Sequence, residues 1–381
     1  MYDFVVVGAG FLGAVFAHEV KKAGKKVLVI EKRDHIGGNC YSYDNPGTNI
    51  NIHKYGPHIF HTPSKNIWDY INSFADFNQY QHRVLTTAGG KIYPLPINLA
   101  TINQFYNLTL TPGEVRAFLE SKTPAVSSPK NLEEKAISLI GKDLYEAFVK
   151  GYTIKQWGCD PRDLPAEVIT RLPVRTSYYD VYYNDDYQGM PVGGYTPIFE
   201  KMLKDIPLEL KTDFLVKRDY WRSVARTLVY TGPIDRYFNY HYGKLRWRSV
   251  RFEIEKMPLE DYQGISVMNY ADHEVPYTRI IEPKHFYRER AHLSPGTIVI
   301  REYPCDDPSE PYYPVGLEAD RETLAKYQHA QSQEKDVIFG GRLAEYKYYD
   351  MDKVISRALQ QVEELLGVDP MADRSISVSQ E

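Results

Sequence analysis

The stretch DFVVVGAGFLGAVFAHEVKKAG, residues 3–24, decides how this chain begins to fold. It starts with a short apolar run typical of a buried strand and continues with the apolar spacing of a helix. KKVLVIEK, residues 25–32, predicts a second buried strand. Gly8, Gly10 and Gly13 stand between the first strand and the helix. The opening is therefore predicted to be a β-α-β unit with a glycine-rich turn.

These three glycines have the G-x-G-x-x-G spacing of a dinucleotide-binding turn. Such glycines allow a tight turn, a close approach of the backbone to a pyrophosphate and close helix packing, while the helix N-terminus favours negative charge. Glu31 follows at the end of the second strand, where a carboxylate can bind both ribose hydroxyls. The combination predicts a bound dinucleotide. The alternative is a glycine-rich turn in an unrelated α/β protein.

Two further glycine clusters favour FAD over NAD, since both cofactors fit the first turn. Residues 37–39, Gly-Gly-Asn, offer a second backbone approach to the cofactor. Residues 337–351, VIFGGRLAEYKYYDM, predict a strand that ends in two glycines, with Arg342 facing a flavin edge. A helix starting near Asp350 would direct its positive end at the pyrimidine carbonyl and stabilise an anionic reduced flavin. The two ends of the chain are therefore predicted to meet on one FAD.

The bulk composition disfavours several functions. The 381 residues include 46 basic and 50 acidic ones, a net charge of −4, which argues against general affinity for nucleic acid. Three scattered cysteines argue against a disulfide framework and a zinc site and favour a reducing compartment, so no metal is expected. No apolar run approaches membrane-spanning length, and we expect a soluble cytoplasmic protein. The 32 tyrosines suit sugar and nucleotide surfaces, or are ordinary strand residues.

The rest of the chain predicts two more domains. Capping pairs at 111–114 and 131–134 predict a helical insertion. Alternating runs such as LRWRSVRFEIE, 245–255, and GTIVIREYP, 296–304, predict antiparallel strands over about 241–330. The fold class is α/β: a Rossmann-like FAD-binding domain with an inserted helical domain and an antiparallel β-sheet domain. The predicted boundaries are 1–76, 190–240 and 331–369 for the FAD-binding domain, 98–175 for the helical domain with a mobile substrate loop, 77–97, 176–189 and 241–330 for the sheet domain, and 370–381 for a disordered tail.

Two short stretches predict particular elements. HRVLTTAGGKIYPLP, residues 82–96, alternates around Gly89 and Gly90 and predicts a hairpin. DMDKVISRALQQVEELLG, residues 350–367, predicts an amphipathic helix that Gly367 ends.

Ten stretches that fall in order along nearly the whole chain carry a more specific signal. They are VVGAGFLGAVFA, VLVIEKRDHIGGN, HKYGPHIFHT, GYTIKQWG, RLPVR, YQGMPVGGYT, YTGPID, VPYTRIIE, EPYYPV and GGRLAEYKYYDM. Together they resemble the bacterial UDP-galactopyranose mutase family. A match this dispersed is far more specific than a glycine-rich turn alone.

The resemblance implies an isomerase that interconverts UDP-galactopyranose and UDP-galactofuranose without net oxidation and supplies galactofuranose for cell-surface polysaccharide. It implies FAD, active when reduced, with flavin N5 attacking the anomeric carbon and holding the sugar as a covalent adduct while UDP departs and returns. It also implies an electron donor such as NAD(P)H or a reductase, and a homodimer. No nucleic acid or membrane partner is expected.

The predicted FAD contacts follow the glycine-rich ends of the chain and the segments that the resemblance adds between them. They are Gly8, Gly10, Leu12, Gly13, Glu31, Lys32, Gly38, Asn39, His58, Ile59, Asp213, Phe214, Gly341, Arg342, Tyr349, Asp350, Met351 and Val354. By resemblance, the backbone at His58 and Ile59 contacts the N5 region of the flavin. Composition alone would make His58 an ordinary loop histidine.

A departing diphosphate calls for arginines, whose forked donors match phosphate oxygens. By resemblance, Arg171 and Arg279 form this pair, with Arg171 on a mobile loop that closes over substrate. His58 and Asp350 complete the predicted catalytic set, Asp350 near sugar and flavin.

The remaining substrate contacts are also carried by the resemblance. Tyr152 and Phe148 are expected to hold the uracil, Trp157 to lie nearer the sugar and diphosphate, and three tyrosines to bind the diphosphate. Arg248 is expected on the sugar side. The predicted substrate-binding residues are His82, Phe148, Tyr152, Thr153, Trp157, Arg171, Tyr182, Arg248, Asn269, Arg279, Tyr313 and Tyr348.

One position departs from the family pattern. His82 stands where some members carry asparagine, which leaves open the contact there and the tolerance of a 2-substituent, as in UDP-N-acetylgalactosamine. Three other classes also stay open: an amine oxidase-like flavin oxidoreductase, a non-enzymatic GDP-dissociation-inhibitor-like protein of the same fold, and an NAD dehydrogenase. The second glycine cluster at 340–341 disfavours the last.

Overall fold

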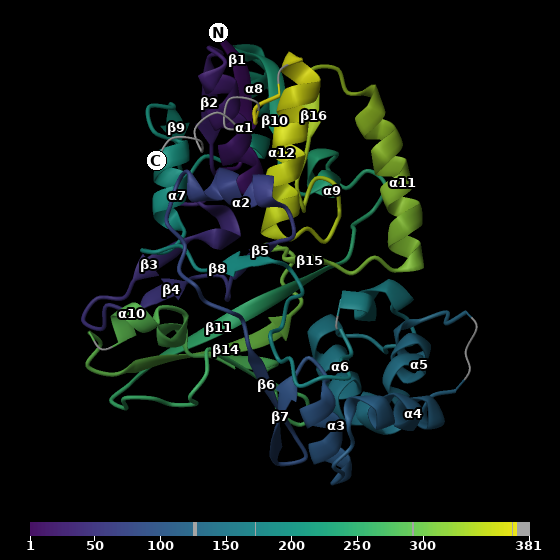
Figure 1. The fold of residues 1–381 in the computed structure, drawn as a ribbon. Helices are drawn as coiled ribbons and strands as arrows, with labels where there is room; N and C mark the ends of the chain where they lie inside the picture. Colours follow the sequence, from purple (N-terminus) through teal and green to yellow (C-terminus); the bar gives the residue numbers. More distant parts are fainter. Residues whose placement is uncertain (125–127, 172, 292, 368, 372–381) are drawn as a thin grey trace.

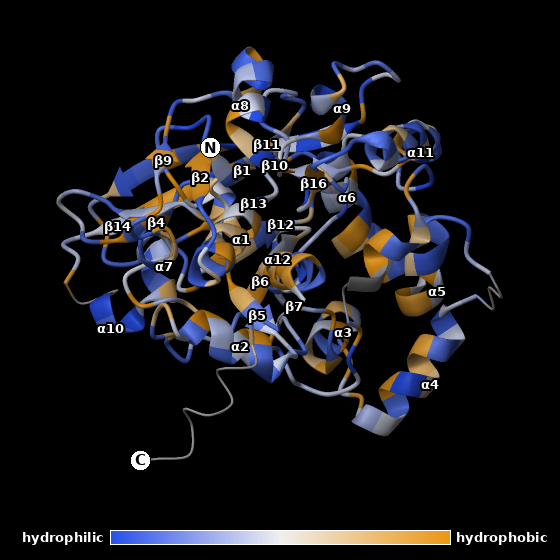
Figure 2. Ribbon diagram, turned by 90° about the horizontal axis from the view of Figure 1, so that it is seen from above, coloured by the Kyte–Doolittle hydropathy of each residue, from blue (hydrophilic) through white to orange (hydrophobic). Residues whose placement is uncertain are grey.

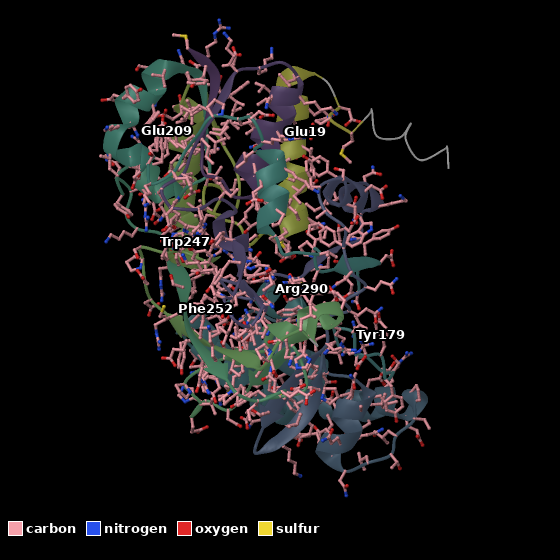
Figure 3. The ribbon with its side chains drawn as sticks, turned by 90° about the vertical axis from the view of Figure 1, so that its left-hand side faces the viewer. Glu19, Tyr179, Glu209, Trp247, Phe252 and Arg290 are labelled. Carbon is pink, nitrogen blue, oxygen red and sulfur yellow. The ribbon has the colours of Figure 1, made fainter. Side chains whose placement is uncertain are left out.

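The structure is a computed structural model that describes residues 1–124, 128–171, 173–291, 293–367 and 369–371. Figure 1 shows three parts: an α/β part around β1 and α12, a large sheet around β11 and β14 below it, and a group of helices from α3 to α6 beside that sheet. Figure 3 shows the stacking from another side, with Glu19 and Glu209 in the α/β part and Phe252 in the sheet.

The α/β part is built on a five-stranded sheet in which every neighbouring pair is parallel. Its strands, in spatial order, are β16 (Val337–Phe339), β10 (Ala225–Tyr230), β1 (Tyr2–Val7), β2 (Val27–Ile30) and β9 (Leu208–Glu209). Parallel strands covered on both faces have continuous apolar sequences, as β1 and β2 do. The predicted Rossmann-like domain is confirmed, and strands from both ends of the chain lie in one sheet.

Helices pack on both faces of this sheet. One face carries α1 (Phe11–Lys22), α7 (Thr196–Met202) and α12 (Met351–Leu366), and the other carries η4 (Phe214–Lys217) and α8 (Arg218–Val224). Successive side chains of a strand point to opposite faces, so Val6 packs with α1 while Val5 packs against Phe214 and Trp221. Figure 2 shows the resulting concentration of apolar residues along α1. As predicted, α12 ends at Gly367, whose φ is 64°.

The large sheet has seven strands. In spatial order they are β15 (Tyr313–Pro314), β11 (Trp247–Met257), β14 (Thr297–Cys305), β13 (Arg279–Ile281), β12 (Val267–Tyr270), β6 (Val84–Ala88) and β7 (Lys91–Leu95). The predicted antiparallel sheet is confirmed with one exception, because β12 and β6 pair in parallel. The hairpin of β6 and β7 is confirmed too, and Gly89 and Gly90 supply its turn with φ values of 55° and 73°.

The helical part connects β7 to the segment before β8. It comprises α3 (Leu99–Tyr106), α4 (Pro112–Lys122), α5 (Leu132–Leu144), the π-helical turn η2 (Tyr145–Lys150), α6 (Gly151–Trp157) and η3 (Ala166–Arg171). The first predicted capping box is present, since Thr111 and Glu114 satisfy each other's backbone N–H groups. Asn131 caps α5 by accepting a hydrogen bond from the backbone N–H of Glu134.

Shorter elements connect these parts. They are η1 (Gly38–Cys40), β3 (Ser42–Asp44), β4 (Asn51–His53), β5 (Phe60–Thr62), α2 (Lys65–Asn72), β8 (Tyr187–Gly189), α9 (Ile234–Tyr237), η5 (Pro283–Phe286) and α10 (Arg288–Ala291). β3 pairs with β4, and β5 pairs with β8, both antiparallel.

The strands predicted over 241–330 are wrong at their end, where the structure has the helix α11 (Glu318–Gln333). Of its residues only Asp320 and Tyr327 are buried, so its sequence lacks the apolar stripe that reveals most helices. Tyr327 packs with Ile234 and Leu245, which attaches α11 to the α/β part.

Other expectations concern absences and the chain end. The three cysteines are free, as predicted. No helix among the described residues combines the length and apolar character needed to cross a membrane. Most of the tail predicted at 370–381 lies outside the described residues.

Candidate active site

The glycine-rich turn of β1 and α1 forms a cradle open on one side. A Cβ on Gly13 would lie 1.9 Å from the carbonyl oxygen of Gly8, so a side chain there would prevent the close strand–helix contact. Gly8 has a φ of 107°, and a Cβ there would lie 2.1 Å from Thr231 Oγ1. A Cβ on Gly10 would meet only Gly38 Cα, at 3.8 Å. Gly10 therefore leaves a free backbone surface at the N-terminus of α1, where a pyrophosphate fits.

Glu31 lies beside this cradle with its carboxylate fixed by backbone groups. It is 6% exposed and accepts hydrogen bonds from the N–H groups of Ala9 and Arg33, at 2.8 and 2.9 Å. Each oxygen keeps lone-pair capacity, so the carboxylate can still accept from ribose hydroxyls. This arrangement fits the sugar of a dinucleotide.

A large cavity runs from the cradle to the start of α12. Its empty volume is about 1340 Å³, including the open mouth. All the predicted FAD contacts except Ile59 and Asp350 line it, and both exceptions adjoin lining residues in sequence. The cavity thus draws its walls from the two ends of the chain, and its glycine cradle, acidic ribose site and length fit FAD.

Part of the cavity wall was not predicted. Residues missed include Arg33, Thr212, Arg236, Glu310 and the segment 230–233. Arg33 donates to Glu310 at 2.5 Å, and its guanidinium lies 4.2 Å from the centre of the Tyr55 ring. Arg33 and Glu310 are far apart in sequence, which hides their pairing. The motif YTGPID, at 230–235, was the available signal for its segment.

Arg342 connects this cavity to a group of tyrosines. It lines the cavity, and its guanidinium lies 5.2 Å from the ring centre of Tyr348 and 5.7 Å from that of Tyr313. The two rings are stacked at 5.3 Å with an interplanar angle of 10°. Arg342 also donates to the carbonyl oxygens of Tyr312 and Tyr349, at 3.3 and 2.5 Å. Two predicted diphosphate tyrosines are therefore held directly behind the cavity wall.

Arg279 is fixed in the neighbouring sheet by Glu302, which sequence analysis missed. Its Nε donates to Oε1 and its Nη2 pairs with Oε2, both at 2.8 Å. Glu302 is 1% exposed and the Arg279 side chain is 22% exposed, so the pair is buried on the carboxylate side only. Burial lowers the pKa of Arg279, but Glu302, Tyr152 and Tyr313 together outweigh burial, and the net pKa is raised well above the usual value. The guanidinium is therefore permanently charged.

The charge of Arg279 acts on several other predicted site residues. Burial raises the pKa of Tyr182 to about 12, and Arg279 opposes that rise; the same two effects act on the pKa of Tyr152 and that of Tyr313. Burial, with a smaller contribution from Arg279 in the same direction, lowers the pKa of His82 to about 3. The structure thus gathers these residues, from four separate segments, around one cation.

The charges of both Arg279 and Arg342 act on His58. Burial lowers its pKa to about 4, and both arginines contribute in the same direction. Its Nδ1 lies 2.7 Å from the carbonyl oxygen of Gly56. A carbonyl can only accept, so Nδ1 carries the proton and Nε2 of the neutral ring is a hydrogen-bond acceptor. Since His58 lines the cavity, it offers an acceptor at the flavin site.

Other predicted substrate residues have structural partners. The Phe148 ring packs edge-on against Tyr93, with ring centres 5.0 Å apart, in the core of the helical part. Arg248 donates to the carbonyl oxygens of Lys155 and Gln156 and pairs with Asp306, so its guanidinium is occupied by the protein.

The remaining predicted residues lie close to the group. Thr153 and Trp157 follow Tyr152 on α6, Thr153 buried and Trp157 partly buried. Asn269 faces Arg279 across β12 and β13. Arg171 ends η3, and its side chain lies outside the described part of the structure.

The Rossmann-like sheet, the glycine cradle and the dinucleotide cavity define a flavin-type enzyme with a second, cationic site beside the cofactor. Residues 147–348 match the family model of UDP-galactopyranose mutase, and residues 6–74 match that of an NAD(P)-binding Rossmann-like domain. A probable UDP-galactopyranose mutase of Klebsiella pneumoniae is 43% identical over 96% of this chain and 95% of its own. A dTDP-fucopyranose mutase of Escherichia coli is 39% identical over 94% and 97%. The chain belongs to the UDP-galactopyranose mutase family.

Solved structures agree on the fold. A reduced UDP-galactopyranose mutase matches with a TM-score of 0.75, covering 96% of each chain at 15% identity. Oxidases share the fold with lower similarity: a putative protoporphyrinogen oxidase from Exiguobacterium covers 95% of this chain with a TM-score of 0.66 at 12% identity. In sequence, an (S)-6-hydroxynicotine oxidase of Paenarthrobacter nicotinovorans is 32% identical over only 32% of this chain. The protein is therefore a flavin-dependent enzyme of the isomerase class, and its cofactor is FAD.

Proposed function

We propose that this protein interconverts UDP-galactopyranose and UDP-galactofuranose with reduced FAD. The observation that carries the proposal is the placement of Arg279, a fixed and partly exposed cation surrounded by tyrosine hydroxyls next to the flavin cavity. Guanidinium and phenol groups are the donors that a diphosphate needs. An amine oxidase would have no use for a diphosphate site of this kind.

Gly10, Glu31, Gly341 and the N-terminus of α12 would hold the FAD. Reduced flavin supplies the nucleophile for the anomeric carbon. The protein's own task is to keep UDP in place while its bond to the sugar is broken and remade. Arg279 neutralises charge on the diphosphate, and Arg171 is proposed as its partner. The Tyr313–Tyr348 stack presents hydroxyls whose positions Arg342 fixes.

His58 and Asp350 are proposed to act at the sugar end. His58 Nε2, as an acceptor, can receive a hydrogen bond from a sugar hydroxyl or from the flavin edge. Asp350 precedes α12. Burial raises the pKa of Tyr183, which follows Tyr182 in sequence, and the charge of Asp350 raises it further in the same direction. Phe148, Tyr152, Thr153 and Trp157 remain the proposed wall for the base.

The experiment is direct. Purified protein should be yellow and should convert UDP-galactofuranose to UDP-galactopyranose after reduction by dithionite, with no consumption of reductant per turnover. Oxygen uptake with an amine would indicate an oxidase, and colourless protein would indicate a binding protein of the same fold. Because the Escherichia coli relative is a dTDP-fucopyranose mutase, dTDP-fucofuranose should be assayed in parallel.

We also propose the cellular setting. The free cysteines fit a cytoplasmic protein. NAD(P)H or a reductase would deliver the electrons, the product would supply a cell-surface polysaccharide, and the enzyme would act as a homodimer. Equilibrium sedimentation of the purified protein tests the last point.

A further inference from the structure

The side chain of Lys155 ends in an unusual environment. It projects from α6, the helix that carries Tyr152 and Trp157, and its ammonium group donates to four backbone carbonyl oxygens. The acceptors are the carbonyls of Tyr270, Asp272, Val275 and Tyr277, at 2.8, 2.8, 3.0 and 3.1 Å. Convergent carbonyls of this kind take the place of the hydration shell of a cation.

The four carbonyls belong to the last residue of β12 and to the loop that joins β12 to β13. Asn269 lies just before the loop and Arg279 just after it, and the two face each other across the strands. The backbone N–H of Tyr270 donates to the carbonyl of Thr278 at 2.9 Å, which closes the loop at its base. Any movement of this loop is therefore transmitted to Arg279.

The same helix touches the loop at its first residue. A Cβ on Gly151 would lie 2.4 Å from the carbonyl oxygen of Ala271, so only glycine permits this contact. At the other end of α6, Arg248 donates to the carbonyls of Lys155 and Gln156, at 3.1 and 2.9 Å. Two cations therefore fix α6: its own Lys155 donates to the loop, and Arg248 of β11 donates to the backbone of α6. Figure 1 shows α6 within the helical part, on the side toward the large sheet.

The ammonium group keeps its charge at neutral pH. Burial lowers the pKa of Lys155 to about 8, while the nearby carboxylates of Asp272 and Glu274 raise it. Arg248, with its partner Asp306, reaches α6 from β11 but donates to the backbone carbonyl of Lys155 and not toward its ammonium group. No hydrogen bond joins its Nζ to a carboxylate among the described contacts, so the backbone carbonyls are its direct partners.

We propose that Lys155 is a positioning residue: a tethered cation that locks the β12–β13 loop onto α6 and thereby sets the distance between the base-binding residues and Arg279. Its direct partner is the loop backbone, and it acts on the nucleotide through Tyr152 on one side and Arg279 on the other. This inference rests on the proposed function, because it takes α6 and Arg279 as two halves of one UDP site.

Lys155→Met removes the charge and keeps the length of the side chain. Lys150→Met is the matched control, since Lys150 lies on the preceding turn, is 45% exposed and contacts only Glu146, at 3.8 Å, among the ion pairs of the structure. For Lys155→Met we expect the Kd for UDP and the KM for UDP-galactofuranose to rise about tenfold, with kcat changed less than about threefold. FAD content should equal that of the wild type, and Lys150→Met should match the wild type throughout.

A rescue experiment separates a tethered cation from simple packing. Lys155→Ala leaves the carbonyl ring open, so ammonium chloride should restore UDP affinity while tetramethylammonium chloride, which has no N–H donors, should not. A folded Lys155→Ala with weak UDP binding and no ammonium response would overturn the proposal, as would a Lys155→Met indistinguishable from wild type. If wild-type enzyme binds UDP but fails to isomerise UDP-galactofuranose, the proposed function is wrong while the UDP-binding comparison still tests Lys155.

If Lys155→Met and Lys155→Ala both lose FAD, a comparison of wild type with Lys155→Arg tests whether the charge at position 155 supports UDP binding. UDP affinity of the wild type should fall between pH 7 and about 8.5 as Lys155 loses its proton, and Lys155→Arg should show no such fall, since the uracil ring of UDP stays neutral over that range. Tyr270 stays neutral in this range, because burial raises its pKa to about 12. Wild-type affinity that is flat across the range would contradict the proposal.

Discussion

At the scale of single residues, Arg279 and Glu302 show how one site can be both rigid and charged. A carboxylate that is 1% exposed fixes the guanidinium by two contacts at 2.8 Å, while the arginine keeps an exposed edge. The Nε–Oε1 contact is a hydrogen bond and the Nη2–Oε2 contact is an ion pair, and together they orient the guanidinium as well as attract it. Lysine could supply the charge but not the fork.

Arg279→Ala should therefore lower kcat/KM by about 30- to 1000-fold, corresponding to about 2–4 kcal/mol, and leave the yellow colour. Arg279→Lys is the control, since it keeps a cation beside Glu302 and hence the fold. We expect it to retain the thermal stability of the wild type and to lose most of the activity. Full turnover by Arg279→Ala would show that the diphosphate lies elsewhere.

Two glycines of the cradle, Gly10 and Gly13, give a second prediction. Gly13→Ala places a methyl 1.9 Å from the Gly8 carbonyl and should destabilise even the apoprotein by about 1–3 kcal/mol. Gly10→Ala meets no atom closer than 3.8 Å, so the apoprotein should melt normally but lose FAD affinity, because the methyl occupies the pyrophosphate surface. Melting curves of apoprotein and the ratio of FAD to protein measure the two effects. Equal stability losses in both variants would contradict this division of roles.

At the scale of elements, the helix carrying the proposed base-binding residues depends on a kink. Gly141 interrupts α5 with a φ of 81° and a ψ of 166°, and the π-helical turn η2 and α6 follow. A Cβ there would lie 3.0 Å from the carbonyl oxygen of Lys122. Gly141 therefore allows both the change of backbone direction and the close contact with α4.

Gly141→Ala should lower stability by about 1–2 kcal/mol, because an L-residue is strained at this φ and its methyl crowds α4. Gly113→Ala is the matched control in α4, where no atom lies within 4 Å of the added carbon. Alanine favours a helix over glycine, so Gly113→Ala should be neutral or stabilising. Thermal melting of both variants is the measurement. A neutral Gly141→Ala would mean that the kink is not required.

Elements with a strong local signal were predicted well from the sequence. β1, α1 and β2 have continuous apolar strands and a glycine turn, and the hairpin at Gly89–Gly90 has a turn that few residues other than glycine adopt. α11 was missed because it buries only two side chains. The parallel pairing of β12 with β6 was missed because no local pattern specifies a distant strand partner.

The site divides in the same way. Gly10, Glu31 and Gly341 follow from local motifs, whereas Glu302 and the Arg33–Glu310 pair arise only when distant segments meet. Family resemblance, rather than physical pattern, supplied Tyr152 and Tyr313. The partners of Lys155 could not be predicted, because they are backbone carbonyls, which every residue has whatever its side chain.

At the scale of the whole molecule, buried neutral histidines make stability depend on pH. Burial lowers the pKa of His53 to about 3, that of His58 to about 4 and that of His82 to about 3. In the unfolded chain each would titrate near 6.5, so below that pH the unfolded state binds more protons and is favoured. The stabilisation is present above about pH 6.5 and is lost as pH falls toward 4.

We therefore expect the free energy of unfolding to fall by about 1 kcal/mol for each histidine between pH 6.5 and 5.5, or about 3 kcal/mol for three, because each ring is only half protonated at pH 6.5 in the unfolded chain. Urea denaturation of the apoprotein at several pH values measures this. His53→Gln should be less stable at pH 7.5 but should show a smaller loss toward pH 5.5. Stability that stays flat from pH 7 to 5 would mean that these rings are protonated in the folded protein.

The cavity walls come from β1 near the first residues and from α12 near the last. The wall of β1 and α1 is therefore synthesised before the wall that contains Gly341 and α12, and retention of FAD requires both. Fragments that end before β16 should be colourless, whereas the 381-residue chain should be yellow.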